Sequence, residues 1–171
     1  EPNALHIWPR GKFMLIALPN MDRSFTVTLF LPNTGDISFS TVRSLDDLNS
    51  LFEKNFPDIF ELMPSLQTDY FSNPTGKLGT VRCSQWNVNE SVLIGDAAHA
   101  VVPFFGQGMN ASFEDCTVLN QMIDSSVGWK DLFESFSIKR KIDGDAIADM
   151  ALENYIEMRD SVNKDRFLNQ K

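Results

Sequence analysis

The sequence predicts an α+β fold, with an antiparallel sheet first in the chain and helices last. Runs with strand-like alternation fill the first 42 residues, whereas apolar residues at helical spacing dominate after residue 109. The region between them is mixed, without the regular strand–helix alternation of a parallel α/β sheet. With 171 residues, 43% of them hydrophobic and 22% charged, the chain has the composition of a globular protein.

Three short runs near the start predict an antiparallel meander. They cover residues 5–8, 13–18 and 25–30, and turns rich in Pro, Gly and Asn separate them. The second and third runs are apolar on both faces. One face therefore needs a core, and the other needs a helix layer or a ligand. A fourth strand is predicted over 37–42.

Helical signals follow the predicted sheet. Ser44 is a candidate N-cap, and acidic residues at 46 and 47 suit the first turn of a helix over 45–55. The elements predicted next are a short helix over 59–63, ended by Pro64, and a strand over 78–83.

The stretch 91–115 predicts a strand, a turn, a loop and a helix. Residues 92–94 suit a buried strand, and Gly95-Asp96 turns the chain into a Pro- and Gly-rich loop. A helix is predicted from Met109 to about Ile123. Glycines before a helix leave backbone N–H groups open, and the helix dipole adds positive potential, so the stretch suits an anionic ligand. Two further helices are predicted, from Trp129 and from the Asp143–Asp145 region through Met158.

Four features of the sequence leave functional and structural interpretations open. Asp96 suits either a sugar-hydroxyl acceptor at a strand end or a turn cap. His99 is expected to pack within the turn, because no further ligand or nucleophile motif accompanies it. Gly106-Gln107-Gly108, next to two Phe residues, suits a ligand loop or an ordinary turn. Asn154 suits either a buried polar group or a helix surface.

Composition excludes several classes of protein. The net charge of −8 argues against nonspecific binding of nucleic acid. Cys83 and Cys116 are too few for a disulfide framework or a zinc site, and no apolar run is long enough to span a membrane. The chain begins without Met and with strand-like sequence at once, so we expect it to be part of a longer protein.

Two motifs carry a specific resemblance. Gly95-Asp96-Ala97-Ala98-His99, followed by the string from Val102 to Ala111, resembles the second flavin-binding motif of the FAD-dependent aromatic hydroxylases with the para-hydroxybenzoate-hydroxylase fold. Ser112 is a departure, because Gly is expected there. The segments Leu5 to Arg10, Phe13 to Asn20, Asp145 to Asp149 and Asn154 to Arg159 narrow the resemblance to the members that hydroxylate kynurenine.

The resemblance implies an FAD enzyme that uses NADPH and O2 to convert L-kynurenine to 3-hydroxykynurenine through a flavin hydroperoxide. No catalytic side chain, no metal and no NADPH-contact residue is implied. The implied cofactor-binding residues are Gly95, Asp96, Gly106, Gln107, Gly108, Met109 and Asn110. The implied substrate-binding residues are Leu5, Ile16, Leu18, Phe30, Pro103, Phe104, Asn154 and Met158.

The resemblance also implies a division of the chain. Residues 1–84 would form most of a substrate domain with an antiparallel sheet, and 85–126 the strand-turn-helix half of a Rossmann-like FAD domain. Residues 127–171 would form C-terminal helices lining the substrate site. The family's N-terminal Gly-x-Gly-x-x-Gly region and C-terminal membrane anchor do not occur in the sequence.

We therefore expect an N-terminal half of the same enzyme as partner, and an isolated fragment that is soluble and inactive. The implied location is the mitochondrial outer membrane, facing the cytosol. Two alternatives stay open: a related flavin hydroxylase for another aromatic acid, and a non-catalytic protein-binding domain.

Overall fold

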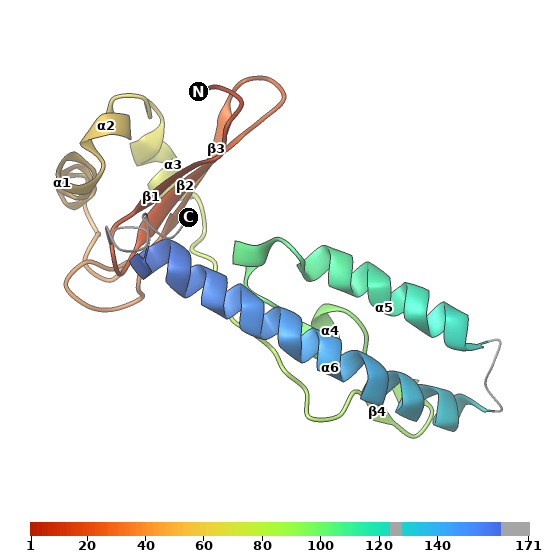
Figure 1. Cartoon of the computed structure of the whole chain (residues 1–171). Helices are drawn as coiled ribbons and strands as arrows, with labels where there is room; N and C mark the ends of the chain where they lie inside the picture. Colours follow the sequence, from red (N-terminus) through yellow and green to blue (C-terminus); the bar gives the residue numbers. More distant parts are fainter. Residues whose placement is uncertain (124–127, 162–171) are drawn as a thin grey trace. The chain divides into compact units, whose positions relative to one another are not determined.

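The computed structural model describes residues 1–123 and 128–161, which divide into two compact units (Figure 1). Among the described residues, the sheet unit comprises residues 1–76 and 157–161, and the helical unit comprises residues 77–123 and 128–156. Small antiparallel sheets combined with helices agree with the predicted α+β class. The predicted division at residues 84 and 126 stays a prediction.

The sheet unit contains the predicted meander. Its strands are β1 (His6–Pro9), β2 (Met14–Pro19) and β3 (Phe25–Phe30), joined in that order by antiparallel pairing. Leu15 lies opposite Leu29, and Ala17 lies opposite Val27. These four side chains share one face because successive strand residues point to opposite faces. The strand predictions for this region are confirmed to within one residue at each end.

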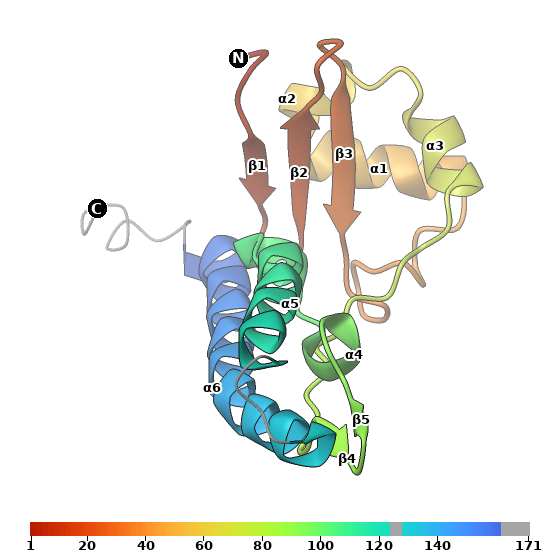
Figure 2. The same ribbon diagram turned by 90° about the vertical axis from the view of Figure 1, so that its right-hand side faces the viewer.

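A helix layer covers one face of this sheet. It consists of α1 (Leu45–Asn55), α2 (Pro57–Phe60) and α3 (Leu66–Ser72), all on the same side in Figure 2. The Oγ atom of Ser44 accepts the N–H of Asp47 at 3.2 Å, and the Asp47 carboxylate accepts the N–H of Ser44 at 3.0 Å. This reciprocal capping box satisfies two backbone donors at the helix start and confirms the predicted cap.

The second predicted helix is misplaced, and a third was missed. α2 begins at Pro57, because the fixed φ of proline suits the first helical position and its missing N–H is not needed there. It ends at Phe60 rather than near Pro64, and α3 follows without having been predicted.

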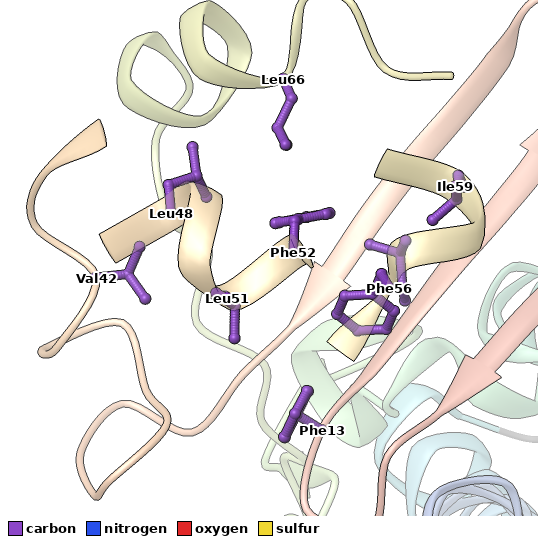
Figure 3. Close-up of a cluster of buried hydrophobic side chains, with 9 residues drawn as sticks. Phe13, Val42, Leu48, Leu51, Phe52, Phe56, Ile59 and Leu66 are labelled. Atoms are coloured by element: carbon purple, nitrogen blue, oxygen red, sulfur yellow. The ribbon is translucent and has the colours of Figure 1, made fainter. Parts of the chain in front are cut away.

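The core of the sheet unit lies between the sheet and its helix layer (Figure 3). Phe52 and Phe56 are 1% and 0% exposed, and their ring centroids lie 5.4 Å apart. Phe56 also meets Phe13 edge to face at 6.0 Å. The other buried members are Leu15, Val42, Leu48, Leu51, Ile59 and Leu66.

The predicted fourth strand over 37–42 is wrong, because hydroxyl side chains bond the local backbone instead. Ser38 is completely buried, and its hydroxyl donates to the carbonyl of Gly35 at 2.9 Å. The hydroxyl of Thr41 donates to the carbonyl of Ser38 at 2.9 Å. Ser and Thr bonds of this kind give the backbone an alternative to ladder pairing, and the segment forms bends and turns.

The helical unit is built on two long helices that run side by side (Figure 1). Its elements are β4 (Asn87–Val88), β5 (Ser91–Val92), α4 (Asp96–His99), the 3-10 turn η1 (Pro103–Phe105), α5 (Gly108–Ile123) and α6 (Trp129–Ile156). The α5 prediction is confirmed to within one residue. The π-helical turn η2 (Glu157–Ser161) belongs to the sheet unit, where it contacts β1.

One continuous helix replaces the two predicted after residue 128. Gly144 lies inside α6, where a glycine normally weakens a helix. A Cβ placed on Gly144 would lie 2.8 Å from Cη2 of Trp86. The glycine is therefore explained by close packing against the indole, and the acidic residues around it do not mark a helix start.

The predicted buried strand over 92–94 is wrong in length and in burial. β5 ends at Val92, and the side chains of Leu93 and Ile94 are each 39% exposed. Among the described residues β5 pairs with β4 alone, so the apolar run lacks a neighbouring strand on its other side. Residues 78–83 form no strand either, although the N–H of Val81 donates to Ala100 at 2.8 Å.

Within the part of the chain that the structure describes, none of the helices combines the length and the apolar character needed to cross a bilayer.

Candidate functional site

A glycine turn and the start of α5 lie close together in the helical unit. Gly95 has φ +58° and ψ −142°, a conformation that favours glycine. A Cβ on Gly95 would lie 3.1 Å from Oγ of Ser112, so the turn packs directly on α5. The hydroxyl of Ser112 donates to the carbonyl of Gly108 at 3.0 Å, within the helix. Glycine at position 95 therefore permits both the turn and its close approach to α5.

An open groove of about 470 Å³ lies beside this contact. Its size is within the range usual for small-molecule sites. The lining residues are Asp96, Val101, Pro103, Gly106, Gly108, Met109 and Ser112. Five of these seven are site residues predicted from the sequence, and the structure brings these five together.

Two of the implied cofactor residues, Gln107 and Asn110, contact each other rather than the groove. Nδ2 of Asn110 donates to Oε1 of Gln107 at 2.9 Å. This side-chain bond joins the residue just before α5 to the first turn of the helix, next to the groove.

The C-terminal end of α6 contacts the 3-10 turn η1. Nδ2 of Asn154 donates to the backbone carbonyl of Phe104. The rings of Phe104 and Tyr155 stack with centroids 4.5 Å apart. Asn154 is half-buried, so the helix-surface interpretation of this residue does not hold. Phe105, next to Phe104, is 41% exposed and is not a core residue.

A buried ionic cluster joins the glycine turn to both long helices. The cluster centres on Asp115, which is completely buried. Oδ2 of Asp115 accepts the backbone N–H of Gly95 at 2.9 Å and lies 2.6 Å from Nε2 of His99. Nε of Arg140 donates to Oδ1 at 2.9 Å. Since an ionised carboxylate can only accept hydrogen bonds, Nε2 of His99 carries a proton in this contact.

Arg140 itself is 1% exposed and reaches three carboxylates. Besides Asp115, it contacts Oε2 of Glu114 at 3.0 Å and Oδ2 of Asp143 at 2.8 Å. Burial alone would lower the pKa of Arg140, but these acidic partners, led by Asp115, raise it instead. The guanidinium is therefore held charged inside the protein.

The pKa of Asp115 is lowered. Burial favours the neutral acid and by itself would raise this pKa. The hydrogen bonds from His99, from the backbone N–H of Gly95 and from Arg140 together outweigh burial. His99 is 2% exposed and stacks on Trp86 with ring centroids 4.9 Å apart, as the predicted packing role requires.

The remaining implied substrate residues lie in the sheet unit. Ile16 and Leu18 point to the face of β2 opposite the helix layer, and Phe30 lies on the same face, opposite Met14. Leu5 lies just before β1 and is 52% exposed, and Leu18 is 49% exposed. Met158 belongs to η2, which contacts β1. Met14 on this face is completely buried, whereas Leu18 is half exposed. The sequence predicted a helix layer or a ligand for the face away from the core.

Sequence reasoning gave no role to Asp115 or Arg140. A signal was available, because Asp115 occurs on the same helical face as Gly108 and Ala111. Arg140 likewise lies between Phe136 and Gly144 on the packed face of α6. A charged residue on each of two packed faces indicates a buried ion pair.

The groove combines features that suit a polyhydroxylated ligand with a planar, electron-rich ring. The carboxylate of Asp96 lines the groove and can accept from hydroxyl groups. The first backbone N–H groups of a helix such as α5 have no partner within the helix, so they suit an acceptor on a ligand. Val101, Pro103 and Met109 supply apolar surface. Among the described residues no group of three or more His, Cys, Asp or Glu side chains is placed to hold a metal ion.

Comparison with known proteins identifies the family. The sequence profile described as "FAD binding domain" matches residues 63–150, just over half of the chain. A protein of Myxococcus xanthus named kynurenine 3-monooxygenase is 52% identical over 172 residues, covering 100% of this chain and 37% of the relative. Proteins of the same name from Flavobacterium johnsoniae and Cytophaga hutchinsonii are 50% and 53% identical, covering 100% and 98% of this chain.

The chain spans between 37% and 39% of the length of these curated relatives. The relatives and the family profile confirm the resemblance drawn from the sequence, and FAD is the predicted cofactor that the family description names. The chain belongs to the family of FAD-binding domains.

Proposed function

We propose that this chain is part of an FAD- and NADPH-dependent monooxygenase that hydroxylates L-kynurenine to 3-hydroxykynurenine. The names of relatives about 50% identical to it support this substrate and reaction. The structural observation that carries the proposal is the groove lined by Asp96, Gly106, Gly108 and Met109. Gly95 and the fold around it would then form half of a Rossmann-like FAD site.

Asp96 is assigned to the hydroxyl groups of the ribityl chain. A carboxylate near phosphate groups would repel them, whereas it accepts hydrogen bonds from hydroxyls without penalty. The start of α5, from Gly108 through Asn110, would direct N–H donors at the electron-rich edge of the flavin, with Gln107 bonded to Asn110 beside it. Each donor is worth more in a site from which water is excluded.

Bound FAD, once reduced by NADPH, would supply the transfer of one oxygen atom from O2 to the aromatic ring. The protein's own residues bind and orient the substrate and keep water away. No residue of this chain is assigned to NADPH, and no protein base is required.

In the sheet unit, Leu5, Ile16, Leu18 and Phe30 are assigned to the substrate's aromatic ring. The face that Ile16, Leu18 and Phe30 share, and the exposed position of Leu5, support this role. Met158 in η2 is assigned to the same substrate.

In the helical unit, Asn154 is assigned to the substrate's carboxylate, and Pro103 and Phe104 to its ring. The amide of Asn154 is held by the carbonyl of Phe104, which fixes its orientation. The mitochondrial outer-membrane location implied by the resemblance stays a prediction, and the relatives named above are bacterial.

The test is a substrate screen on the full-length protein. We expect it to purify with the visible absorption of a bound flavin, to oxidise NADPH faster when L-kynurenine is added, and to release 3-hydroxykynurenine. Stimulation by another aromatic acid without turnover of L-kynurenine would instead identify a related hydroxylase. Absence of flavin uptake would favour the protein-binding alternative.

A further inference from the structure

The two walls of the groove come from separate segments, so something must set their spacing. One wall is the turn at Gly95 and Asp96, and the other is the first turns of α5, including Gly108 and Ser112. Gly95 and Ser112 are in close contact, yet van der Waals contact alone is not directional.

A directional link between these walls exists, and it is the side chain of Asp115. Its Oδ2 accepts the N–H of Gly95 at 2.9 Å, and Asp115 lies on α5, two turns beyond Gly108. The same oxygen lies 2.6 Å from Nε2 of His99, at the other end of α4 from Asp96. One carboxylate therefore holds both ends of the short helix that carries Asp96.

The carboxylate of Asp115 is also held through its second oxygen, Oδ1, by Arg140. Nε of Arg140 donates to Oδ1 at 2.9 Å, and both side chains are buried. Nη1 of Arg140 also donates to Oδ2 of Asp143 at 2.8 Å, within α6. A charge-assisted bond in a buried setting has a narrow geometry, so the position of Asp115 is restricted.

We propose that Asp115 is a positioning residue for the flavin cofactor, whose carboxylate, held by Arg140, fixes the Gly95–Asp96 turn against the start of α5. The inference rests on the proposed function, because it assigns the groove to FAD. Asp115 acts through the turn and does not itself line the groove.

Asp115→Asn in the full-length protein is the direct test. An amide has one acceptor oxygen, so either the Gly95 and His99 side or the Arg140 side then faces an NH2 group. We expect the dissociation constant for FAD, measured by quenching of flavin fluorescence on the apoprotein, to rise at least about tenfold. The visible absorption bands of the bound flavin should shift, because the donors at its edge are displaced.

Glu114→Gln is the matched control. It removes the same unit of charge beside Arg140, but Glu114 is 57% exposed and does not bond the turn. We expect FAD affinity within about twofold of the wild type, because solvent screens the exposed Glu114 carboxylate and Arg140 keeps its bond to Asp115. Leu132→Ala controls for lost stability, because it opens a cavity at a buried position of α6 away from Asp115.

If Asp115→Asn does not fold, a second pair of variants tests the positioning role of Asp115. His99→Gln keeps an N–H that can reach Asp115, whereas His99→Leu removes it. We expect His99→Leu to weaken FAD binding and His99→Gln to restore most of it.

The outcomes separate the inference from the proposed function. Wild-type protein that binds FAD, with equal affinity in Asp115→Asn, overturns the positioning role and leaves the function standing. The positioning role is also overturned if Leu132→Ala lowers the melting temperature as much as Asp115→Asn and weakens FAD binding equally. General destabilisation would then be the cause. Wild-type protein that takes up no FAD contradicts the proposed function itself.

Discussion

Nε2 of His99 lies 2.6 Å from Oδ2 of Asp115, and neither side chain is more than 2% exposed. The contact joins α4 to α5 across 16 positions of sequence. His99 therefore has a structural role: its ring stacks on Trp86, and its Nε2–H donates to the carboxylate of Asp115.

The buried carboxylate predicts a specific dependence of stability on pH. The native pKa of Asp115 lies below its value of 3.8 in the unfolded chain, so its stabilising effect is complete above that value. The effect is lost as the pH falls through the native pKa. Asp115→Asn should cost about 3–5 kcal/mol of unfolding free energy at pH 7, and less as the pH falls below about 4. Denaturant unfolding of both proteins at several pH values measures this, and a constant difference would contradict it.

Gly144→Ala should destabilise the protein, although alanine is the better helix former. The added Cβ would lie 2.8 Å from the Trp86 ring, which is 1% exposed and has no room to move. We expect a loss of about 1–3 kcal/mol, more than the ~1 kcal/mol that alanine gains by helix propensity. Gly79→Ala is the control, because nothing lies within 4 Å of its added Cβ. Equal melting temperatures for both variants would refute the packing argument.

Ser44→Ala should remove the capping box of α1. The variant loses the bond from the Asp47 N–H to Oγ, and with it the geometry of the return bond. We expect a loss of about 1 kcal/mol in unfolding free energy. Ser50→Ala, at an exposed position inside the same helix, should leave stability unchanged or slightly higher. A comparable loss in both would show that the cap contributes nothing.

Asn154→Ala should raise the KM for L-kynurenine in the full-length protein. The substitution removes the proposed carboxylate contact and also the bond to the Phe104 carbonyl. We expect at least a tenfold increase, about the value of one hydrogen bond to a charged group. Steady-state kinetics with Asn120→Ala, an exposed position of α5, as the control would show it. An unchanged KM would favour a hydroxylase with a different substrate.

Leu18→Ala should separate substrate binding from folding. Leu18 is 49% exposed on the face of β2 opposite the helix layer, so its truncation should cost little stability. If it contacts the substrate ring, KM should rise about tenfold or more, as expected for about 1–3 kcal/mol of lost apolar contact. Leu62→Ala, at an exposed leucine that follows α2, should change neither quantity. A fall in melting temperature without a rise in KM would assign Leu18 to folding alone.

Local signals predicted the parts of the fold that depend on neighbours in sequence. β1 to β3 follow from alternation and from turn residues, and α1 follows from Ser44 and the acidic residues after it. The segment 37–42 was misjudged because its pattern suits a strand while its hydroxyl groups bond the backbone nearby. The alternation of apolar and polar residues does not indicate whether a Ser or Thr hydroxyl will bond a nearby backbone carbonyl.

The burial of a segment depends on which other elements pack against it, and a local sequence pattern does not contain that information. Leu93 and Ile94 form an apolar run, but β5 pairs with β4 alone among the described residues and the run stays partly exposed. Five of the predicted site residues line one groove, and all five are close in sequence. Asp115 and Arg140 meet across 25 positions. The helical pattern puts each on a packed face, but it does not state which charge the other one meets.

The Trp86 ring fits the notch at Gly144, and Arg140 lies one helical turn earlier on the same face of α6. A shift of α6 by one residue along its axis would bring Asp143 or Asp145 beneath the indole and draw the guanidinium away from Asp115. The helix α6 therefore has one permitted register against its neighbours. Gly144 sets it by leaving room for the indole, and Arg140 sets it by its ion pair with Asp115.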